Sequence, residues 1–310
     1  MTHSIQLGLC CINTCLRCSK PPVFCSRTMI LKTIAIKGLN EIKVRAIKNL
    51  EDMKVLLEWN YSNDIFVYRM SSEMFPHLSN PLIEKYSLDF ASELLSEIGL
   101  LAKKLGQRLT FHPGQFNNLG SPREEIISKT ITELEDHSLI MDLMGLDKDS
   151  VIVIHGGGTY GNKKNTINKF KQNFYRLNES TRNRLVLENC EKSYSTEDCL
   201  EICNELNIPM VHDTHHYKCY SIYHPEIIQR PAEELIPEIL QTWIRRGIKP
   251  KFHISEQGPG RVGHHSDYIE TIPEYLLNIP RDYSISIDIM VEAKMKEQAI
   301  LRLKIKYPFL

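Results

Sequence analysis

The chain has 310 residues, of which 42% are hydrophobic, 25% charged and 8% aromatic, and its formal net charge is zero. These fractions are typical of globular proteins, and they exclude a disordered, a collagenous or a coiled-coil chain. The charge balance neither requires nor excludes a nucleic-acid partner. No apolar run is long enough for a membrane span, so we expect no membrane partner.

The nine cysteines are an odd number and most stand singly, which is typical of a reducing compartment. Cys15 and Cys18 have the spacing of a zinc hook, but no second Cys/His pair follows at a matching distance, so free thiols are the favoured interpretation. The first basic residue, Arg17, follows the apolar N-terminal run, whereas in a signal peptide it precedes it. We therefore expect an intracellular protein, in the cytoplasm or the nucleus.

Short β-branched runs alternate with longer segments of helical periodicity. In chain order, strands are predicted at residues 6–11, 65–70, 108–111, 151–155, 185–188, 209–213, 251–254 and 285–291. Helices are predicted at residues 36–59, 83–105, 124–144, 166–175, 196–206, 232–246, 267–277 and 293–304. Parallel strands joined by helical crossovers produce such alternation, and eight units close into a barrel.

The predicted fold class is therefore α/β, as a single TIM-type (β/α)8 barrel. No linker rich in Pro, Gly or Ser interrupts the pattern, so residues 1–310 are predicted to form one domain, with residues 295–310 as a basic C-terminal tail segment. A doubly wound open sheet is the alternative architecture.

Most predicted strands end on side chains that can bind a metal ion. From the third strand to the eighth, these are His112, His155, Glu188, Asp213 with His215 and His216, His253 with Glu256, and Asp288 with Glu292. A barrel brings all C-terminal strand ends to one face, where crowded carboxylates would raise one another's pKa unless cations compensate them. Mixed histidine and carboxylate ligands suit zinc, manganese or iron. The pattern predicts a multinuclear metal site.

Residues 161–184 contain seven basic side chains and a single acidic one. This segment follows the Gly156–Gly158 turn, so it is expected at the same face, and Lys163 and Lys164 are its candidate DNA-binding residues. Further basic residues lie at 245–251 and 294–306. Solvated helix faces explain each run equally well, whereas beside a metal site the runs would form a path for phosphates.

At these residues the chain resembles the UV damage endonuclease family of metal-dependent DNA repair nucleases. The matching segments are Leu7-Gly8 with Asn13, and residues 68–76, 112–116, 155–157, 187–189, 212–216, 251–253, 265–268 and 288–294. They follow the family order from about residue 5 to about residue 295. The resemblance implies a TIM-type barrel that cuts damaged double-stranded DNA 5′ to pyrimidine dimers and 6-4 photoproducts, and at other lesions such as abasic sites.

The resemblance also implies two or three divalent metal ions, with Mn²⁺ expected. The implied ligands are His112, His155, Glu188, Asp213, His216, His253, His265 and Glu292, joined by Lys251 if its amine is carboxylated. Glu188, Lys251, His253 and Glu292 are the expected catalytic residues. Gln115 and Phe116 match residues that probe the duplex at the lesion, and Asn13 matches a residue of the damage pocket. We expect the enzyme to be a monomer.

Three positions depart from the family pattern. Asn80 stands where the family often has a histidine ligand, so either His77 or Asn80 would complete a third metal site. Phe116 and Leu9 stand where some members have tyrosine. Two other functions remain open: a metal-dependent sugar isomerase of the same barrel superfamily, and a damaged-DNA-binding protein without catalytic activity.

Overall fold

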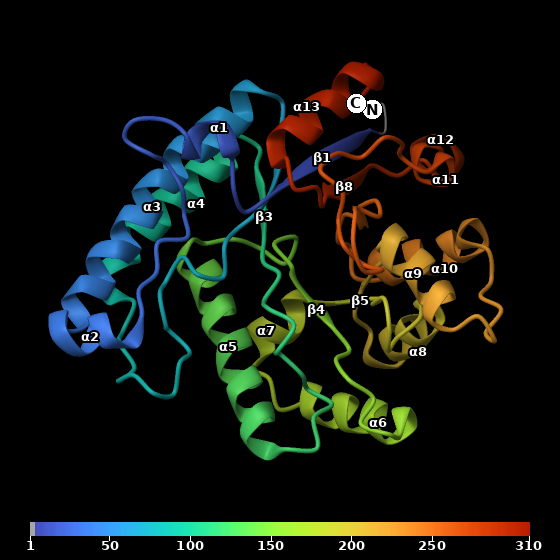
Figure 1. The fold of residues 1–310 in the computed structure, drawn as a ribbon, viewed down its shortest axis with the longest axis horizontal. Helices are drawn as coiled ribbons and strands as arrows, with labels where there is room; N and C mark the ends of the chain where they lie inside the picture. Colours follow the sequence, from blue (N-terminus) through green and yellow to red (C-terminus); the bar gives the residue numbers. More distant parts are fainter. Residues whose placement is uncertain (1–3) are drawn as a thin grey trace.

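The computed structural model describes residues 4–310, and in this range eight parallel strands form the centre of the molecule (Figure 1). They are β1 (Ile5–Cys10), β2 (Val67–Arg69), β3 (Arg108–Thr110), β4 (Ile152–His155), β5 (Leu185–Glu188), β6 (Met210–Val211), β7 (Lys251–Ile254) and β8 (Ile287–Val291). One sheet has the order β3-β2-β1-β8-β7, and the other has the order β4-β5-β6. The pairing of β1 with β8, the first and last strands, is characteristic of a closed barrel.

Isolated bridges join the two sheets at both seams. Phe111 pairs with Ile152 between β3 and β4, and its N–H and carbonyl groups both hydrogen-bond across this seam at 2.9 Å. Asp213 pairs with His253 between β6 and β7, where the His253 N–H lies 3.1 Å from the His212 carbonyl. The predicted TIM-type (β/α)8 barrel is confirmed, and closure at both seams excludes the doubly wound alternative.

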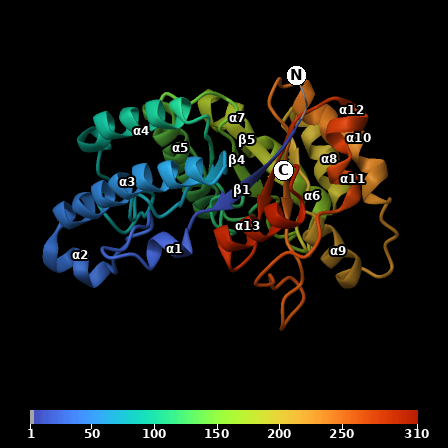
Figure 2. The same ribbon diagram turned by 90° about the horizontal axis from the view of Figure 1, so that it is seen from above.

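The helices surround the strands (Figures 1 and 2). They are α1 (Thr14–Arg17), α2 (Leu31–Lys37), α3 (Leu39–Ser62), α4 (Ser92–Lys104), α5 (Glu124–Leu143), α6 (Lys163–Phe174), α7 (Glu179–Arg184), α8 (Thr196–Leu206), α9 (Thr214–Tyr223), α10 (Ala232–Ile244), α11 (Glu274–Leu277), α12 (Ile279–Tyr283) and α13 (Lys296–Lys306), with a 3-10 turn, η1, at Asp89–Ala91. Between residues 4 and 310, none of these helices combines the length and the apolar character needed to cross a bilayer.

Helix α9 follows β6 where no helix was predicted. Asp213 caps it, because its Oδ1 atom accepts hydrogen bonds from the N–H groups of His215 and His216, both at 2.7 Å. A carboxylate at this position satisfies free N–H donors and favours the positive end of the helix dipole. The same residue therefore ends one strand segment and begins the next helix.

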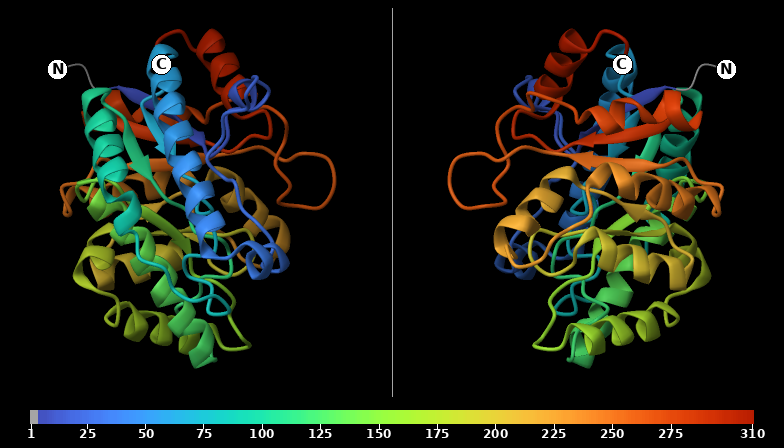
Figure 3. Two further views of the ribbon diagram at one scale, coloured as in Figure 1. Left: turned by 90° about the vertical axis from the view of Figure 1, so that its left-hand side faces the viewer. Right: turned by 90° about the vertical axis from the view of Figure 1, so that its right-hand side faces the viewer.

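The prediction of a helix at residues 267–277 is wrong for most of this range. Only Glu274–Leu277 is helical, and residues 255–273 form a long loop after β7 that projects from the barrel (orange in Figure 3). The Glu256 side chain holds this loop by accepting hydrogen bonds from the N–H groups of Glu270 and Thr271 at 2.9 and 3.0 Å. Periodicity alone did not reveal these long-range side-chain contacts.

Alternation along the strands separates the barrel interior from the outer helical layer. On β8, Met290 points inward and forms a small apolar cluster with Cys10 and Val67, separate from the main core between strands and helices. Packing around Gly8 is tight, because a Cβ atom would lie 3.0 Å from the Met290 methyl and 3.1 Å from the Val67 Cβ, so a larger residue would require these side chains to shift. This apolar plug separates the two mouths of the barrel.

The C-terminal segment is part of the barrel. Helix α13 contacts β1 and β8 and buries Ala299, Ile300 and Leu303, so residues 296–306 of the basic C-terminal segment pack against the barrel as a helix. Glu297 on this helix is fully buried. Its carboxylate accepts hydrogen bonds from the N–H groups of Thr14 at 2.7 Å and Cys15 at 2.9 Å, and from the Thr14 hydroxyl. Glu297 thereby fixes the first turn of α1.

Replacing Glu297 with alanine should destabilise the fold, because the buried carboxylate that accepts hydrogen bonds from the first turn of α1 would be lost. A hydrogen bond to a charged group contributes about 1.5–3 kcal/mol. We expect urea denaturation of Glu297→Ala to show a loss of stability of this order. Glu201→Ala is the control, since Glu201 on α8 is 64% exposed. Equal stability of the two variants would contradict the assigned role.

Candidate metal centre

Six strand ends bring metal-capable side chains to the C-terminal mouth of the barrel. They carry His112, His155, Glu188, Asp213, His253 and Glu292, and α9 adds His216. Their ligand atoms form three groups in which all atoms lie within 4.8 Å of one another: His112, His155 and Glu188; His112, His253 and Glu292; and Glu188, Asp213 and His216. Because His112 and Glu188 each belong to two groups, the three groups form one continuous centre.

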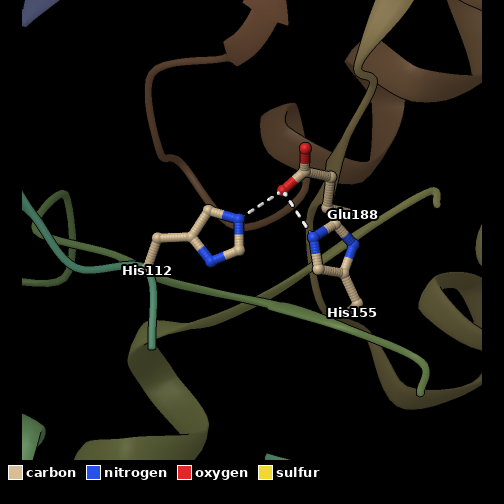
Figure 4. Close-up of side chains that lie close together, drawn as sticks. All are labelled: His112, His155 and Glu188. Carbon is tan, nitrogen blue, oxygen red and sulfur yellow. Dashed lines mark ion pairs between the residues drawn. The ribbon is translucent and has the colours of Figure 1, made fainter. Parts of the chain in front are cut away.

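Glu188 lies in the middle of this centre and is fully buried. Its Oε2 atom is 2.8 Å from Nε2 of His112 and 3.8 Å from Nε2 of His155 (Figure 4). Its Oε1 atom is 3.0 Å from Nδ1 of His253 and 3.5 Å from Nδ1 of His216. Burial by itself would raise the pKa of Glu188, but the imidazoles of His253, His155 and His112 hold it well below its usual range. Glu188 is therefore ionised at neutral pH.

Asp213 is also fully buried, and its two oxygen atoms differ. Oδ1 caps α9, whereas Oδ2 has no hydrogen-bond partner. The Asn189 side chain fixes the backbone of Asp213, accepting from its N–H at 2.8 Å and donating to its carbonyl at 3.0 Å. Burial raises the pKa of Asp213 to about 7, so a cation beside Oδ2 would be needed to keep the carboxylate fully ionised at that pH.

Two of the buried histidines, His155 and His253, are in the protonation state that metal binding requires. Burial lowers the pKa of His155 and of His253 to about 4, so both imidazoles are neutral at pH 7. Burial alone would lower the pKa of His216, but the carboxylates of Asp213 and Glu188 raise it well above its usual value, so this imidazole must release a proton before it binds a metal ion. Nδ1 of His155 is buried without a partner. Nδ1 of His216 lies 3.0 Å from the Asn189 carbonyl, which leaves its Nε2 atom available as a ligand.

Lys251 lies inside the barrel and is fully buried. Its amine is 2.9 Å from Nε2 of His253. Burial, and then the positive charges of Arg69 and Arg108, lower the pKa of Lys251 to about 7. A large fraction of this amine is therefore uncharged at neutral pH.

Glu292 connects the centre to Arg69, a residue that the sequence analysis did not select. Nη1 of Arg69 donates a hydrogen bond to Oε1 of Glu292. The same oxygen is 3.4 Å from Nδ1 of His253, and Oε2 is 3.9 Å from Nε2 of His265. Arg69 is the last residue of β2, so its position at a strand end was the available signal, but arginine is not a metal ligand.

The residues present fit divalent cations. Two carboxylate oxygens of the centre, Oε2 of Glu188 and Oδ2 of Asp213, are buried without hydrogen-bond partners, and so is Nδ1 of His155. The short distance from Oε2 of Glu188 to His112 is a close approach without hydrogen-bond alignment. Buried polar atoms are normally satisfied, and divalent cations held at the centre would satisfy these carboxylate oxygens. Imidazole and carboxylate donors suit first-row divalent metals.

Four of the expected ligands, His265, Lys251, His77 and Asn80, lie outside the three groups. His77 is engaged elsewhere, because Nε2 is 2.5 Å from the Met29 carbonyl and Nδ1 is 3.1 Å from Nδ2 of Asn80. These contacts use both ring nitrogens of His77 and the amide of Asn80. A role for His77 or Asn80 in a third metal site stays a prediction.

The expected lesion-probing residues differ in accessibility. Phe116 is 81% exposed, and Gln115 beside it is exposed as well, on the loop that begins at His112. Asn13 is buried and caps α1, accepting a hydrogen bond from the Leu16 N–H at 2.9 Å, and its Nδ2 atom has no partner. Contacts of these residues with DNA stay predictions.

The basic segment at residues 161–184 is mostly neutralised within the protein. The following pairs are formed: Lys163 with Asp198, Lys171 with Glu205, Arg176 with Glu124, and Arg184 with Asp142. Lys164 and Lys169 are exposed and form no ion pair within residues 4–310. The interpretation as an internally paired helical surface therefore accounts for most of this segment.

The prediction that Asp288 lies at the C-terminal end of a strand, with the metal-capable residues, is wrong. It lies near the start of β8, so it faces the N-terminal mouth, opposite the metal centre. Its Oδ2 atom pairs with Nη1 of Arg108 at 2.6 Å, and its Oδ1 atom pairs with Lys249. A polar residue in a strand sequence does not by itself reveal which mouth it faces.

Comparisons with known proteins agree with this geometry. The family described as UV-endonuclease UvdE matches residues 5–308. A relative from Acanthamoeba polyphaga mimivirus is 41% identical over 98% of this chain and 91% of its own length. The UV-damage endonuclease of Schizosaccharomyces pombe is 40% identical over 97% of this chain and 50% of its own length, so the chain spans half of that relative.

Among solved structures, the crystal structure of SacUVDE matches with a TM-score of 0.83 and 29% identity, covering 99% of this chain and 100% of that one. Endonuclease IV from Thermus thermophilus matches with a TM-score of 0.55 and 15% identity, covering 83% and 93%. L-ribulose 3-epimerase matches with a TM-score of 0.51 and 13% identity, covering 81% and 80%. The last two comparisons show the fold alone.

The buried histidines determine how stability should depend on pH without bound metal. Folding lowers the pKa from 6.5 to about 4 for His155, His215 and His253, and to about 3 for His212. Below about pH 6.5 the unfolded chain binds these protons first, so unfolding becomes easier as the pH falls towards 4. Asp213 has the opposite effect on stability, because its raised pKa lets the folded state bind one proton before the unfolded state does. The Tm of chelator-treated protein should fall from pH 6.5 to 4, and a constant Tm would contradict the assignment.

Proposed function

The chain belongs to the UV-endonuclease UvdE family, and from this premise we propose that it is a DNA repair endonuclease that hydrolyses the phosphodiester bond 5′ to UV photoproducts. The proposed substrates are pyrimidine dimers and 6-4 photoproducts in double-stranded DNA, with abasic sites as further lesions. The proposed active form is a monomer. The observation that carries the proposal is the set of histidine and carboxylate ligands that the strand ends bring around Glu188.

The two alternative functions have less support. A sugar isomerase would use similar ligands, but the similarity to the epimerase extends only to the fold, whereas the endonuclease family matches residues 5–308. A protein that only binds damaged DNA has no need of several buried carboxylates arranged around unpartnered ligand atoms, which cost stability unless cations compensate them. The nuclease is therefore favoured over both.

We propose that two or three divalent cations, expected to be Mn²⁺, bind at the centre. The proposed ligands are His112, His155, Glu188, Asp213, His216, His253, His265 and Glu292. When bound, such cations stabilise the charge that develops on the phosphate and activate water for attack. Glu188 joins adjacent ligand groups, and Asn189 holds Asp213 in position through its backbone. The neutral imidazoles of His155 and His253 would bind without first losing a proton.

We propose that Lys251 carries a carboxylate on its amine and serves as a further ligand. The amine is fully buried, and its polar neighbour is the imidazole of His253, 2.9 Å away. An uncharged amine can attack carbon dioxide, forming the N–C bond of a carbamate and releasing one proton, and this carbamate would place an anionic oxygen donor beside His253. With this change, Glu188, Lys251, His253 and Glu292 would together surround the reacting phosphate as catalytic residues.

We propose that Gln115 and Phe116 enter the duplex at the lesion. Their loop begins at the metal ligand His112, so it is anchored at the centre, while the ring of Phe116 is free to stack on bases. Distorted base pairs cost less to open, which favours insertion at damaged sites. Asn13 would line the damage pocket through its unpartnered amide, and Lys163 and Lys164 would lie near the phosphates.

The function is tested by nicking of supercoiled plasmid DNA, with and without UV irradiation. Manganese-loaded protein should nick irradiated plasmid and largely spare untreated plasmid. Glu188→Gln keeps the side-chain volume but removes the charge shared by two ligand groups, so incision should be abolished while the protein remains folded by circular dichroism. Glu226→Gln, at a carboxylate that is 68% exposed, is the control and should nick normally. Equal nicking of both plasmids, or none, would exclude the proposed function.

The roles of Gln115 and Phe116 are tested by replacing both with alanine. Stacking of a base on an aromatic side chain contributes roughly 1–3 kcal/mol, so binding to a duplex with a single pyrimidine dimer should weaken by about five- to hundredfold. Metal content and Tm should not change, because both side chains are exposed. Phe309→Ala, at a ring that is 70% exposed near the C-terminus, should bind like the unmodified protein. Loss of metal or of folding in the double variant would show a structural role instead.

A further inference from the structure

Arg69 is a charged side chain at the metal centre that has no role in the proposed ligand set. It ends β2 at the C-terminal mouth, and its Nη1 atom donates to Oε1 of Glu292. Within residues 4–310, Glu292 is the only carboxylate at ion-pair distance from it. Arg69 is thus anchored to the centre through one nitrogen.

The other nitrogen atoms of this guanidinium are available. Nε and Nη2 of Arg69 form no hydrogen bond with a protein nitrogen or oxygen atom, and neither is among the buried polar atoms without a partner, so each keeps a small exposed area, although the Cys11 thiol also lies against the guanidinium. The side chain is 16% exposed, compared with 9% for Glu292. Since β2 ends at the C-terminal mouth, the free N–H groups lie where the mouth opens to solvent. They can receive an anion without breaking the pair with Glu292.

Arg108 provides a contrast within the same barrel. It pairs with the fully buried Asp288 at 2.6 Å, and its Nε atom donates to the Asp149 carbonyl at 2.7 Å. Its Nη2 atom is buried. The guanidinium of Arg108 therefore has protein oxygen partners at both Nη1 and Nε and lines a cavity at the N-terminal mouth, whereas that of Arg69 has one carboxylate partner and lies beside the metal ligands.

We propose that Arg69 binds a non-bridging oxygen of the DNA phosphate at the centre while it stays paired with Glu292. The inference rests on the proposed nuclease function and adds a residue that contacts the substrate. Arginine has five N–H donors in a planar fork, so it can serve a carboxylate and a phosphate at the same time. Lysine offers one compact charge and cannot span both anions in this way. The anchor at Glu292 also reduces the entropy lost on binding.

The decisive variant is Arg69→Lys, with Arg108→Lys as the matched control. Arg69→Lys keeps a positive charge beside Glu292, so Tm and manganese content should match those of the unmodified protein. Binding to a duplex oligonucleotide with a single pyrimidine dimer is measured by fluorescence anisotropy in EDTA at several KCl concentrations. Loss of one phosphate contact should reduce the slope of log K against log[KCl] by about 0.9. Single-turnover incision with Mn²⁺ should slow by roughly a hundredfold.

Arg108→Lys should show the salt slope and incision rate of the unmodified protein. Unchanged slope and rate in Arg69→Lys would overturn the proposal. Loss of manganese or of folding in Arg69→Lys would also overturn it, because Arg69 would then be a structural residue. If the unmodified protein fails to nick irradiated DNA, the proposed function fails, but the salt slopes of the three proteins still decide whether Arg69 contacts a phosphate.

Discussion

The burial of the Glu188 carboxylate among four imidazoles is the constraint on which the rest of the centre depends. A buried charge without compensation costs several kcal/mol, so Glu188 requires polar partners on every side. These partners come from β3, β4, β7 and α9, elements far apart in the sequence. Burial lowers the pKa of His155 and of His253 to about 4, so these two imidazoles are neutral at pH 7 and do not balance the charges of Glu188 and Glu292. The strand ends therefore converge on a place where added positive charge is stabilising.

Buried charges are neutralised in different ways at the two mouths of the barrel. At the N-terminal mouth, Asp288 has two cationic partners, Arg108 and Lys249, and these groups neutralise one another. At the C-terminal mouth, three buried carboxylates share one arginine and a lysine of lowered pKa. The apolar plug around Met290 keeps the two sets apart. The paired charges at the N-terminal mouth stabilise the fold. At the C-terminal mouth the cationic side chains do not neutralise all of the buried carboxylates, so this mouth is suited to binding cations and to catalysis.

The sequence predicted much of this arrangement because the signals were local. Residues 185–188, 196–206 and 251–254 were predicted with the bounds that the structure shows, since apolar runs and helix caps are encoded within a few residues. The histidines and carboxylates of the centre were recognisable because each follows an apolar run at a strand end. Closure of a barrel then placed them together.

The features that were missed depend on contacts between distant residues. The loop at 255–273 is held by Glu256, and the basic segment is neutralised by acids on α5 and α8, and neither effect is visible in a local window. Asp288 in β8 and Glu292 directly after it point to the same side of the chain, towards the barrel interior. They have different roles because the apolar plug around Met290 lies between them. Arg69 was overlooked because arginine is not a metal ligand, although its contact with Glu292 places it beside the ligands.

The pairing of the first strand with the last has a consequence for biosynthesis. β1 pairs with β8 from Ile5 and Ile287 onward, and the contact between Thr14 and Glu297 spans 283 positions of the sequence. During translation, the edge of β1 that pairs with β8 therefore stays unpaired until β8 has left the ribosome. Contacts between residues this distant in sequence form late in folding. Glu292 follows β8, so the same event delivers the last carboxylate to the centre. A nascent chain that lacks β8 and Glu292 cannot assemble the complete centre. The centre can therefore form only after synthesis has passed β8.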